Sequence, residues 1–90
     1  MRLNELALRI RTAGDENRLK ILCVLFREHT ICVSDIASYL KLSIATVSHH
    51  LRVMSKEGLV TSVRKGKKIC YCLPNEPFMN DLKKFICKYK

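Results

Sequence analysis

Two sets of side chains in this 90-residue chain have types and spacing that could do chemistry. The first is a run of hydroxyl and imidazole side chains, Ser43-Ile44-Ala45-Thr46-Val47-Ser48-His49-His50. Such side chains can form hydrogen bonds with base edges and phosphates in nucleic acids. The second set consists of thiols, which can be oxidised or can bind soft metal ions. Its five members are Cys23, Cys32, Cys70, Cys72 and Cys87.

A helical wheel divides the stretch 43–56 into two faces. Val47, Leu51 and Met54 fall in one narrow arc and are expected to face the core, with His50 at its edge. We expect His50 to be half-buried and bonded to a backbone carbonyl. The opposite face is short, polar and partly basic, which lets a helix enter a major groove. The residues of this helix expected to contact DNA are Ser43, Ala45, Thr46, Ser48, His49 and Arg52, with Ser43 and Thr46 on phosphates at the helix N-terminus.

A basic cluster follows this helix. Arg64, Lys65, Lys67 and Lys68 surround Gly66 in a predicted turn, where they could lie on phosphates or in a minor groove. The whole chain has 17 Lys and Arg against 8 acidic residues, for a net charge of +9. This excess indicates a polyanionic partner. Double-stranded DNA is the first candidate and an anionic membrane surface the second.

Hydrophobic periodicity predicts the elements that position these residues. Apolar residues at helical spacing indicate helices at about 2–12, 16–27, 33–40, 44–56 and 77–88, with Asp15, Cys32 and Ser43 at N-cap positions. Alternation predicts strands at 59–63 and 69–73, joined as a hairpin. The fold class is therefore mainly α with a two-stranded β wing, a winged helix-turn-helix formed by one domain over residues 1–90.

The two terminal helices, 2–12 and 77–88, have apolar faces that nothing else in the chain covers. We expect them to form a homodimer interface, and a monomer with both helices folded on the core is the alternative. No apolar run approaches the roughly 20 residues that a membrane span needs, and no secretory signal is visible. The sequence thus predicts a cytoplasmic protein without a membrane partner, whose cysteines are thiols by default. The adjacent His49 and His50 point in different directions and no catalytic constellation is visible, so we expect no enzymatic activity.

Three stretches of the chain together resemble the ArsR/SmtB family of bacterial transcriptional repressors. They are Asp15-Glu16-Asn17-Arg18-Leu19-Lys20-Ile21-Leu22, Val33-Ser34-Asp35-Ile36-Ala37, and the run from Leu42 to Leu51 that continues through Glu57-Gly58-Leu59-Val60. The resemblance implies a homodimer on a pseudo-palindromic operator, with an inducer that weakens DNA binding. Many members sense metals through a C-V-C-D box, which here reads Cys32-Val33-Ser34-Asp35 and lacks the second thiol. The family's other metal site uses aspartate and histidine residues on the last helix. This last helix has Asp81 but no histidine, so the resemblance does not extend to that site.

A subgroup of this family that senses persulfides or oxidants is a closer match. Its pattern has one cysteine in the second helix, as in Arg18-Leu19-Lys20-Ile21-Leu22-Cys23, and one near the end of the last helix, here Cys87. The resemblance implies a dithiol switch formed by Cys23 and Cys87, with no cofactor. Two alternatives stay open. One is a repressor that responds to a soft metal ion through Cys32, Cys70 and Cys72, and the other is a constitutive DNA-binding protein with inert cysteines.

Overall fold

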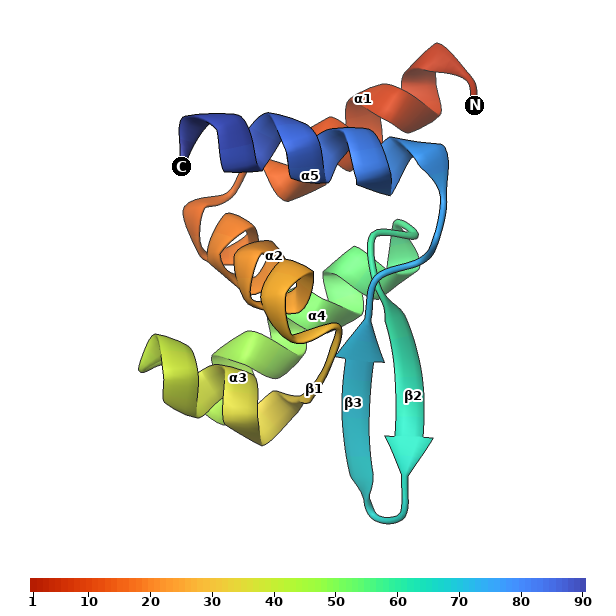
Figure 1. Ribbon diagram of the computed structural model, residues 1–90. Coiled ribbons are helices and arrows are strands. Elements are labelled where there is room, and N and C mark those ends of the chain that lie inside the picture. The colour runs from red at the N-terminus through yellow and green to blue at the C-terminus, as the bar shows by residue number, and fades with distance from the viewer.

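The computed structural model describes residues 1–90 and contains five helices and three strands (Figure 1). Each predicted element is present, and helix ends differ from the prediction by at most one residue. In chain order the elements are α1 (Leu3–Ala13), α2 (Glu16–Glu28), β1 (Thr30–Cys32), α3 (Val33–Leu40), α4 (Ile44–Lys56), β2 (Thr61–Lys65), β3 (Lys68–Cys72) and α5 (Pro77–Tyr89).

Local hydrogen bonds explain where the helices begin and end. The carboxylate of Asp15 accepts a hydrogen bond from the Arg18 backbone N–H at 3.1 Å and caps α2. Ser43 Oγ accepts from the Thr46 N–H at 3.0 Å and caps α4 in the same way. Cys32 also stands at an N-cap position, but its side chain makes no capping hydrogen bond. Gly58, with φ of 77°, follows the end of α4 in the left-handed conformation that glycine adopts without strain.

The sheet has three strands, so the prediction of a two-stranded wing was incomplete. The sequence predicted no strand between the second and third helices, yet Thr30–Cys32 forms β1 and pairs antiparallel with β3. The strand order is β1-β3-β2, which makes β3 the central strand. A central strand has a neighbour on each side. Cys70, which has β1 and β2 on either side, is only 1% exposed, whereas Ile69 near the wing tip is 49% exposed.

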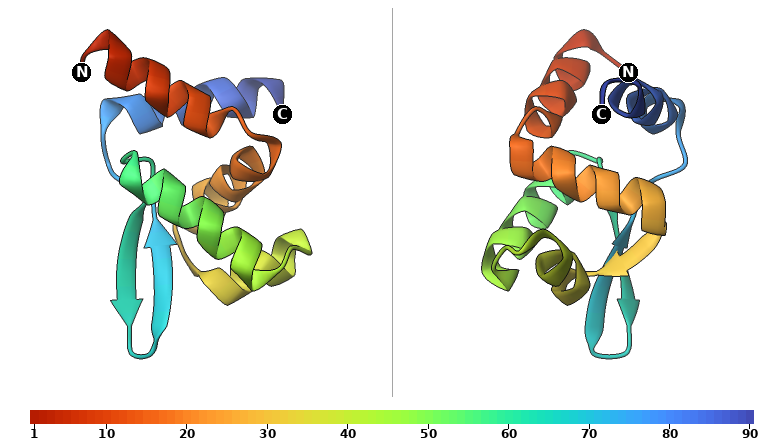
Figure 2. Two further views of the ribbon diagram at one scale, coloured as in Figure 1. Left: turned by 180° about the vertical axis from the view of Figure 1, so that it is seen from behind. Right: turned by 60° about the vertical axis from the view of Figure 1, so that its left-hand side comes forward.

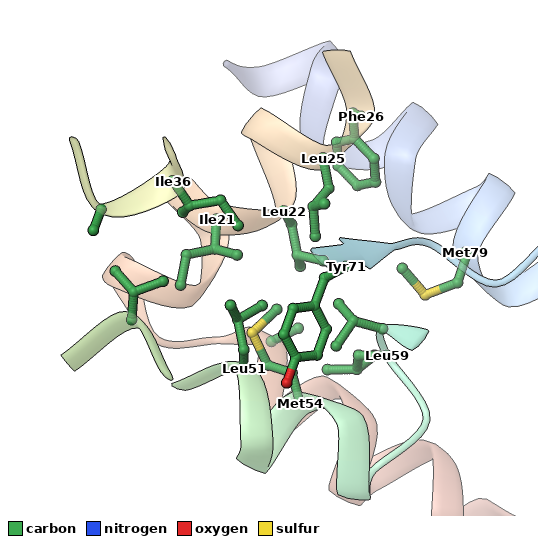
Figure 3. Close-up of a cluster of buried hydrophobic side chains, with 14 residues drawn as sticks. Ile21, Leu22, Leu25, Phe26, Ile36, Leu51, Met54, Leu59, Tyr71 and Met79 are labelled. Carbon is green, nitrogen blue, oxygen red and sulfur yellow. The ribbon is translucent and has the colours of Figure 1, made fainter. Parts of the chain in front are cut away.

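The hydrophobic core lies between α2, α4 and the base of the hairpin (Figure 3). Leu22 and Leu25 of α2 lie opposite Leu51 and Met54 of α4, and Tyr71 of β3 lies between these helices. Val47, Leu51 and Met54 are all 0% exposed, which confirms the predicted buried face of α4. This core therefore sets the orientation of α4 directly.

Helices α1 and α5 cross one another at the end of the molecule opposite the wing (Figures 1 and 2). Arg9 of α1 forms an ion pair with Glu76 at 2.6 Å and lies 5.5 Å from the centre of the Phe78 ring. Each helix nevertheless presents large apolar side chains to solvent, including Leu3 at 81% exposure and Phe85 at 64%. None of the helices has the length and apolar character needed to cross a lipid bilayer.

Candidate nucleic-acid interface

A tight turn joins α3 to α4. Lys41 adopts the left-handed conformation with φ of 58°, and the N–H of Leu42 donates to the carbonyl of Ala37 at 3.0 Å. Ser43 then caps α4, and its hydroxyl also donates to Thr46 Oγ1 at 2.7 Å. Two short helices are thus held at a fixed angle by a turn of three residues. This is the helix-turn-helix arrangement that the sequence predicts.

The outer face of α4 is open to solvent along its length. Ala45, His49 and Arg52 are exposed, and Thr46 and Ser48 are half-buried at its flanks. Ile44, which the sequence analysis did not include, is 58% exposed in the first turn of α4. An exposed isoleucine beside hydroxyl and imidazole groups could contact the methyl group of a thymine. The face therefore offers both hydrogen-bonding and apolar groups to a major groove.

His50 is half-buried, as predicted, but its partner differs from the prediction. Its Nδ1 accepts a hydrogen bond from Nε of Arg18 at 3.2 Å, not from a backbone carbonyl. The same guanidinium donates through Nη1 to the carbonyl of Thr12 at 3.4 Å. Arg18 thus links the end of α1 to α2 and α4. The position of Arg18 in the sequence, one residue before the apolar Leu19, gave no indication that its side chain would bond to His50 and Thr12.

The wing is a β-hairpin that projects away from the helices (Figure 1). Lys65 pairs with Lys68 at the end of the hairpin, and Gly66 lies in the turn between them with φ of 63°. All four predicted wing residues, Arg64, Lys65, Lys67 and Lys68, are exposed. None of them forms an ion pair in this structure. The basic side chains at the wing tip are therefore available to bind phosphates.

The two thiols that the family resemblance assigns to a switch lie at the other end of the molecule. Cys23 is half-buried and lines an apolar cavity of about 630 Å³ between α1, α2 and α5. Cys87 is exposed on α5 and is not part of the cavity wall, although its neighbour Ile86 is. The two thiols are not bonded to each other in this structure.

The expectation that all cysteines are thiols was wrong for two of them. A disulfide joins Cys32 to Cys70, which face each other across β1 and β3. The prediction missed this bond because it required β1, and without that strand Cys32 has no fixed partner. No group of three or more His, Cys, Asp or Glu side chains is arranged to hold a metal ion. Of the set Cys32, Cys70 and Cys72, the first two are bonded to each other in this structure and Cys72 is a free thiol.

A helix-turn-helix followed by a basic hairpin on a compact helical body defines a winged helix-turn-helix domain. Residues 15–62 match the model of the arsR family of bacterial regulatory proteins. These residues run from the N-cap of α2 into β2 and include all of α3 and α4. The chain belongs to the arsR family.

Known proteins similar to this chain agree with that assignment. The cadmium resistance transcriptional regulatory protein CadC of Listeria innocua is 46% identical over 67 residues, which are 74% of this chain and 56% of that protein. The chain thus spans about half the length of such curated relatives. The transcriptional repressor PagR of Bacillus anthracis has a TM-score of 0.81 at 30% identity, over 92% of this chain and 94% of PagR. Reduced HlyU from Vibrio cholerae has a TM-score of 0.85 at 23% identity, over 96% and 88% of the two chains, and shows the shared fold.

Proposed function

We propose that this protein is a sequence-specific DNA-binding transcriptional repressor that acts as a homodimer in the cytoplasm, by binding and without catalysis. One observation carries the proposal: the exposed polar face of α4 and the unpaired basic wing tip belong to one winged helix-turn-helix. The polar face suits base edges in a major groove, and the wing suits flanking phosphates. The names of its relatives, which describe regulatory proteins and repressors, support the same role.

The exposed apolar residues of α1 and α5 support the dimer. Leu3, Leu8 and Ile10 on α1 and Phe85 and Tyr89 on α5 lie on two helices that cross at one end of the molecule. A partner copy would cover these side chains and place two α4 helices at opposite ends of the assembly. A twofold dimer of this kind reads an inverted repeat whose half-sites are separated by about one helical turn of DNA or a multiple of it.

DNA selection tests this function. We expect the protein to enrich duplexes with an inverted repeat from a randomised 30-base-pair library, as read by sequencing. On the selected duplex, the logarithm of the binding constant should fall linearly with the logarithm of salt concentration. Lys67→Ala should reduce this slope by about 0.9, the loss of roughly one phosphate contact. Lys20→Ala, on α2 far from the wing tip, is the matched control and should leave the slope unchanged. Failure to enrich any sequence would contradict the proposal.

We further propose that the Cys23 and Cys87 thiols control release from DNA. Two thiols and one hydrogen peroxide give one S–S bond and two water molecules, and two thiols and hydrogen disulfide give the same bond and two H₂S. Cys87 lies outside the cavity that Cys23 lines, so we expect bond formation to rotate and shift α5. Rotation of α5 would change the apolar face that the dimer buries, and with it the spacing of the two α4 helices.

Matched serine variants test this switch. Starting from protein with the Cys32–Cys70 bond intact, we expect hydrogen peroxide or a persulfide donor to release wild-type protein from the selected duplex in a fluorescence anisotropy titration. Cys23→Ser and Cys87→Ser should bind the duplex as wild type does but stay bound after treatment. Cys72→Ser is the control and should be released. Release of both Cys23→Ser and Cys87→Ser would overturn the assignment.

A metal-responsive alternative is favoured by the names of relatives, among them a cadmium resistance regulatory protein and an arsenical resistance operon repressor. The residues of this chain do not support it. Ser34 occupies the place of the second cysteine in the C-V-C box, and the sulfur of Cys32 is bonded to Cys70. We therefore favour thiol chemistry without a bound cofactor.

A further inference from the structure

The Cys32–Cys70 bond connects two parts of the DNA-binding surface. Cys32 is the last residue of β1 and the N-cap residue of α3, the first helix of the helix-turn-helix. Cys70 is the middle residue of β3, the strand that leads back from the wing tip. Their register, Cys32 opposite Cys70, follows from the pairing of β1 with β3 and places the two sulfurs on one face of the sheet.

The bond also lies at the outermost point where the wing is attached to the body. Strand β1 pairs with β3 through three residue pairs only, Thr30 with Cys72, Ile31 with Tyr71 and Cys32 with Cys70. Beyond Cys70, Ile69 and Lys68 pair only with β2, and the hairpin projects into solvent. Three backbone pairs and the buried Tyr71 hold the base of the wing, and its outer part has no further attachment to the body and is weakly held. A covalent bond at the last of these pairs holds the wing against α3.

The two sulfurs differ in their access to solvent. Cys32 is half-buried and lines an open pocket of about 410 Å³, together with Asp35, Tyr39 and Lys65. Cys70 also borders the pocket but is only 1% exposed. A small thiol or peroxide can therefore reach the sulfur of Cys32, while Cys70 serves as the leaving or resolving group.

We propose that Cys32 and Cys70 are a reversible redox pair whose disulfide form holds the wing in its DNA-binding position. The proposal rests on the DNA-binding function above and concerns cysteines that the switch at Cys23 and Cys87 does not use. In oxidation, the Cys32 thiolate attacks hydrogen peroxide to give a sulfenic acid and hydroxide. The Cys70 thiol then attacks the sulfenic sulfur, which forms the S–S bond and releases one water molecule. The hydroxide takes up the proton that the Cys32 thiol lost on ionising and becomes the second water molecule.

Reduction follows the opposite course. A thiolate of a small dithiol such as dithiothreitol attacks the sulfur of Cys32, and Cys70 leaves as a thiolate and takes up a proton. The second thiol of the reductant closes its own ring and releases Cys32, so one disulfide is exchanged for another. The wing then keeps its backbone pairing with β1 and the packing of Tyr71 in the core, but it loses its covalent link to the start of α3. It must lose conformational freedom each time that DNA is bound, which weakens binding.

The test uses the Cys23→Ser/Cys87→Ser double variant, so that the second switch is absent. We expect hydrogen peroxide to remove two hydrogen atoms from the protein, mapped by peptide mass spectrometry to a Cys32–Cys70 link, and dithiothreitol to restore them. The disulfide form should melt roughly 10 °C higher than the dithiol form, because the link restricts the unfolded chain. On the selected duplex, the dithiol form should bind about tenfold more weakly than the disulfide form. Its binding constant should also depend less steeply on salt concentration, because fewer wing residues contact phosphates.

Further serine variants separate the pair from other effects. In the same background, Cys32→Ser and Cys70→Ser should bind DNA with the affinity of the dithiol form and ignore both reagents. Cys72→Ser, two residues from Cys70 on the same strand, should respond as its parent does. A disulfide mapped to other cysteines, or equal affinities of the two forms, would overturn the proposal. Mass and melting temperature report on the pair even if no duplex is bound, so a failure of the DNA-binding function would be recognised separately.

Discussion

Val47→Asp is expected to unfold the domain at 25 °C. Val47 is 0% exposed and packs in the core through the inner face of α4. The substitution removes a buried apolar side chain and leaves a carboxylate without a partner, which together cost about 5–8 kcal/mol. That amount is comparable with the whole stability of a domain of this size, roughly 5–15 kcal/mol. Circular dichroism should show loss of helix and no cooperative thermal transition.

Ala45→Asp is the matched control for this prediction. It introduces the same charge two residues earlier, on the exposed face and in the first turn of α4, where the helix dipole favours an anion. Its melting temperature should stay within about 3 °C of wild type. A cooperative transition of Val47→Asp within about 5 °C of wild type would show that α4 does not pack as described.

His49→Ala is expected to weaken binding to the selected duplex by about tenfold while leaving the fold intact, because one base or phosphate contact is worth roughly 1–2 kcal/mol. His49 is exposed at the middle of the outer face of α4, and its imidazole makes no hydrogen bond within the chain. If it reads a base, binding to a scrambled duplex should change little and the salt slope should stay constant. Fluorescence anisotropy on both duplexes measures the difference.

His29→Asn is a suitable control for this variant. His29 also carries an imidazole, but it lies directly after the end of α2, on a different part of the molecule, and its side chain makes no hydrogen bond. This variant should bind both duplexes as wild type does. An unchanged affinity of His49→Ala for the selected duplex would remove His49 from the reading surface. The contrast with Lys67→Ala, which should weaken binding to both duplexes, separates base reading from phosphate contact.

The helices could be predicted closely because each carries its own pattern. The apolar spacing of Val47, Leu51 and Met54 gave the buried face of α4, and Asp15 and Ser43 marked helix starts that the structure confirms. These signals are local, since periodicity and capping depend on residues within a few positions of one another. The DNA-contact residues remain predictions, which the binding experiments above test.

The features that the sequence did not reveal depend on residues far apart in the chain. Strand β1 has only three residues and exists because β3 pairs with it, so its own pattern is too short to be recognised. The disulfide between Cys32 and Cys70 spans 38 positions and depends on that pairing. The bond from Arg18 to His50 spans 32 positions and joins two helices. Only the packed fold brings such pairs together.

The bond between Cys32 and Cys70 also divides the molecule topologically. Residues 32–70 become a closed covalent ring that contains α3, α4, β2 and the wing tip, and hence every residue proposed to contact DNA. The two segments outside the ring are tails that carry α1, α2 and α5, the apolar surfaces and the Cys23 and Cys87 thiols. In the proposed dimer, oxidation of Cys23 and Cys87 can therefore change the position of one copy's ring relative to the other's. The covalent connections within each ring stay the same.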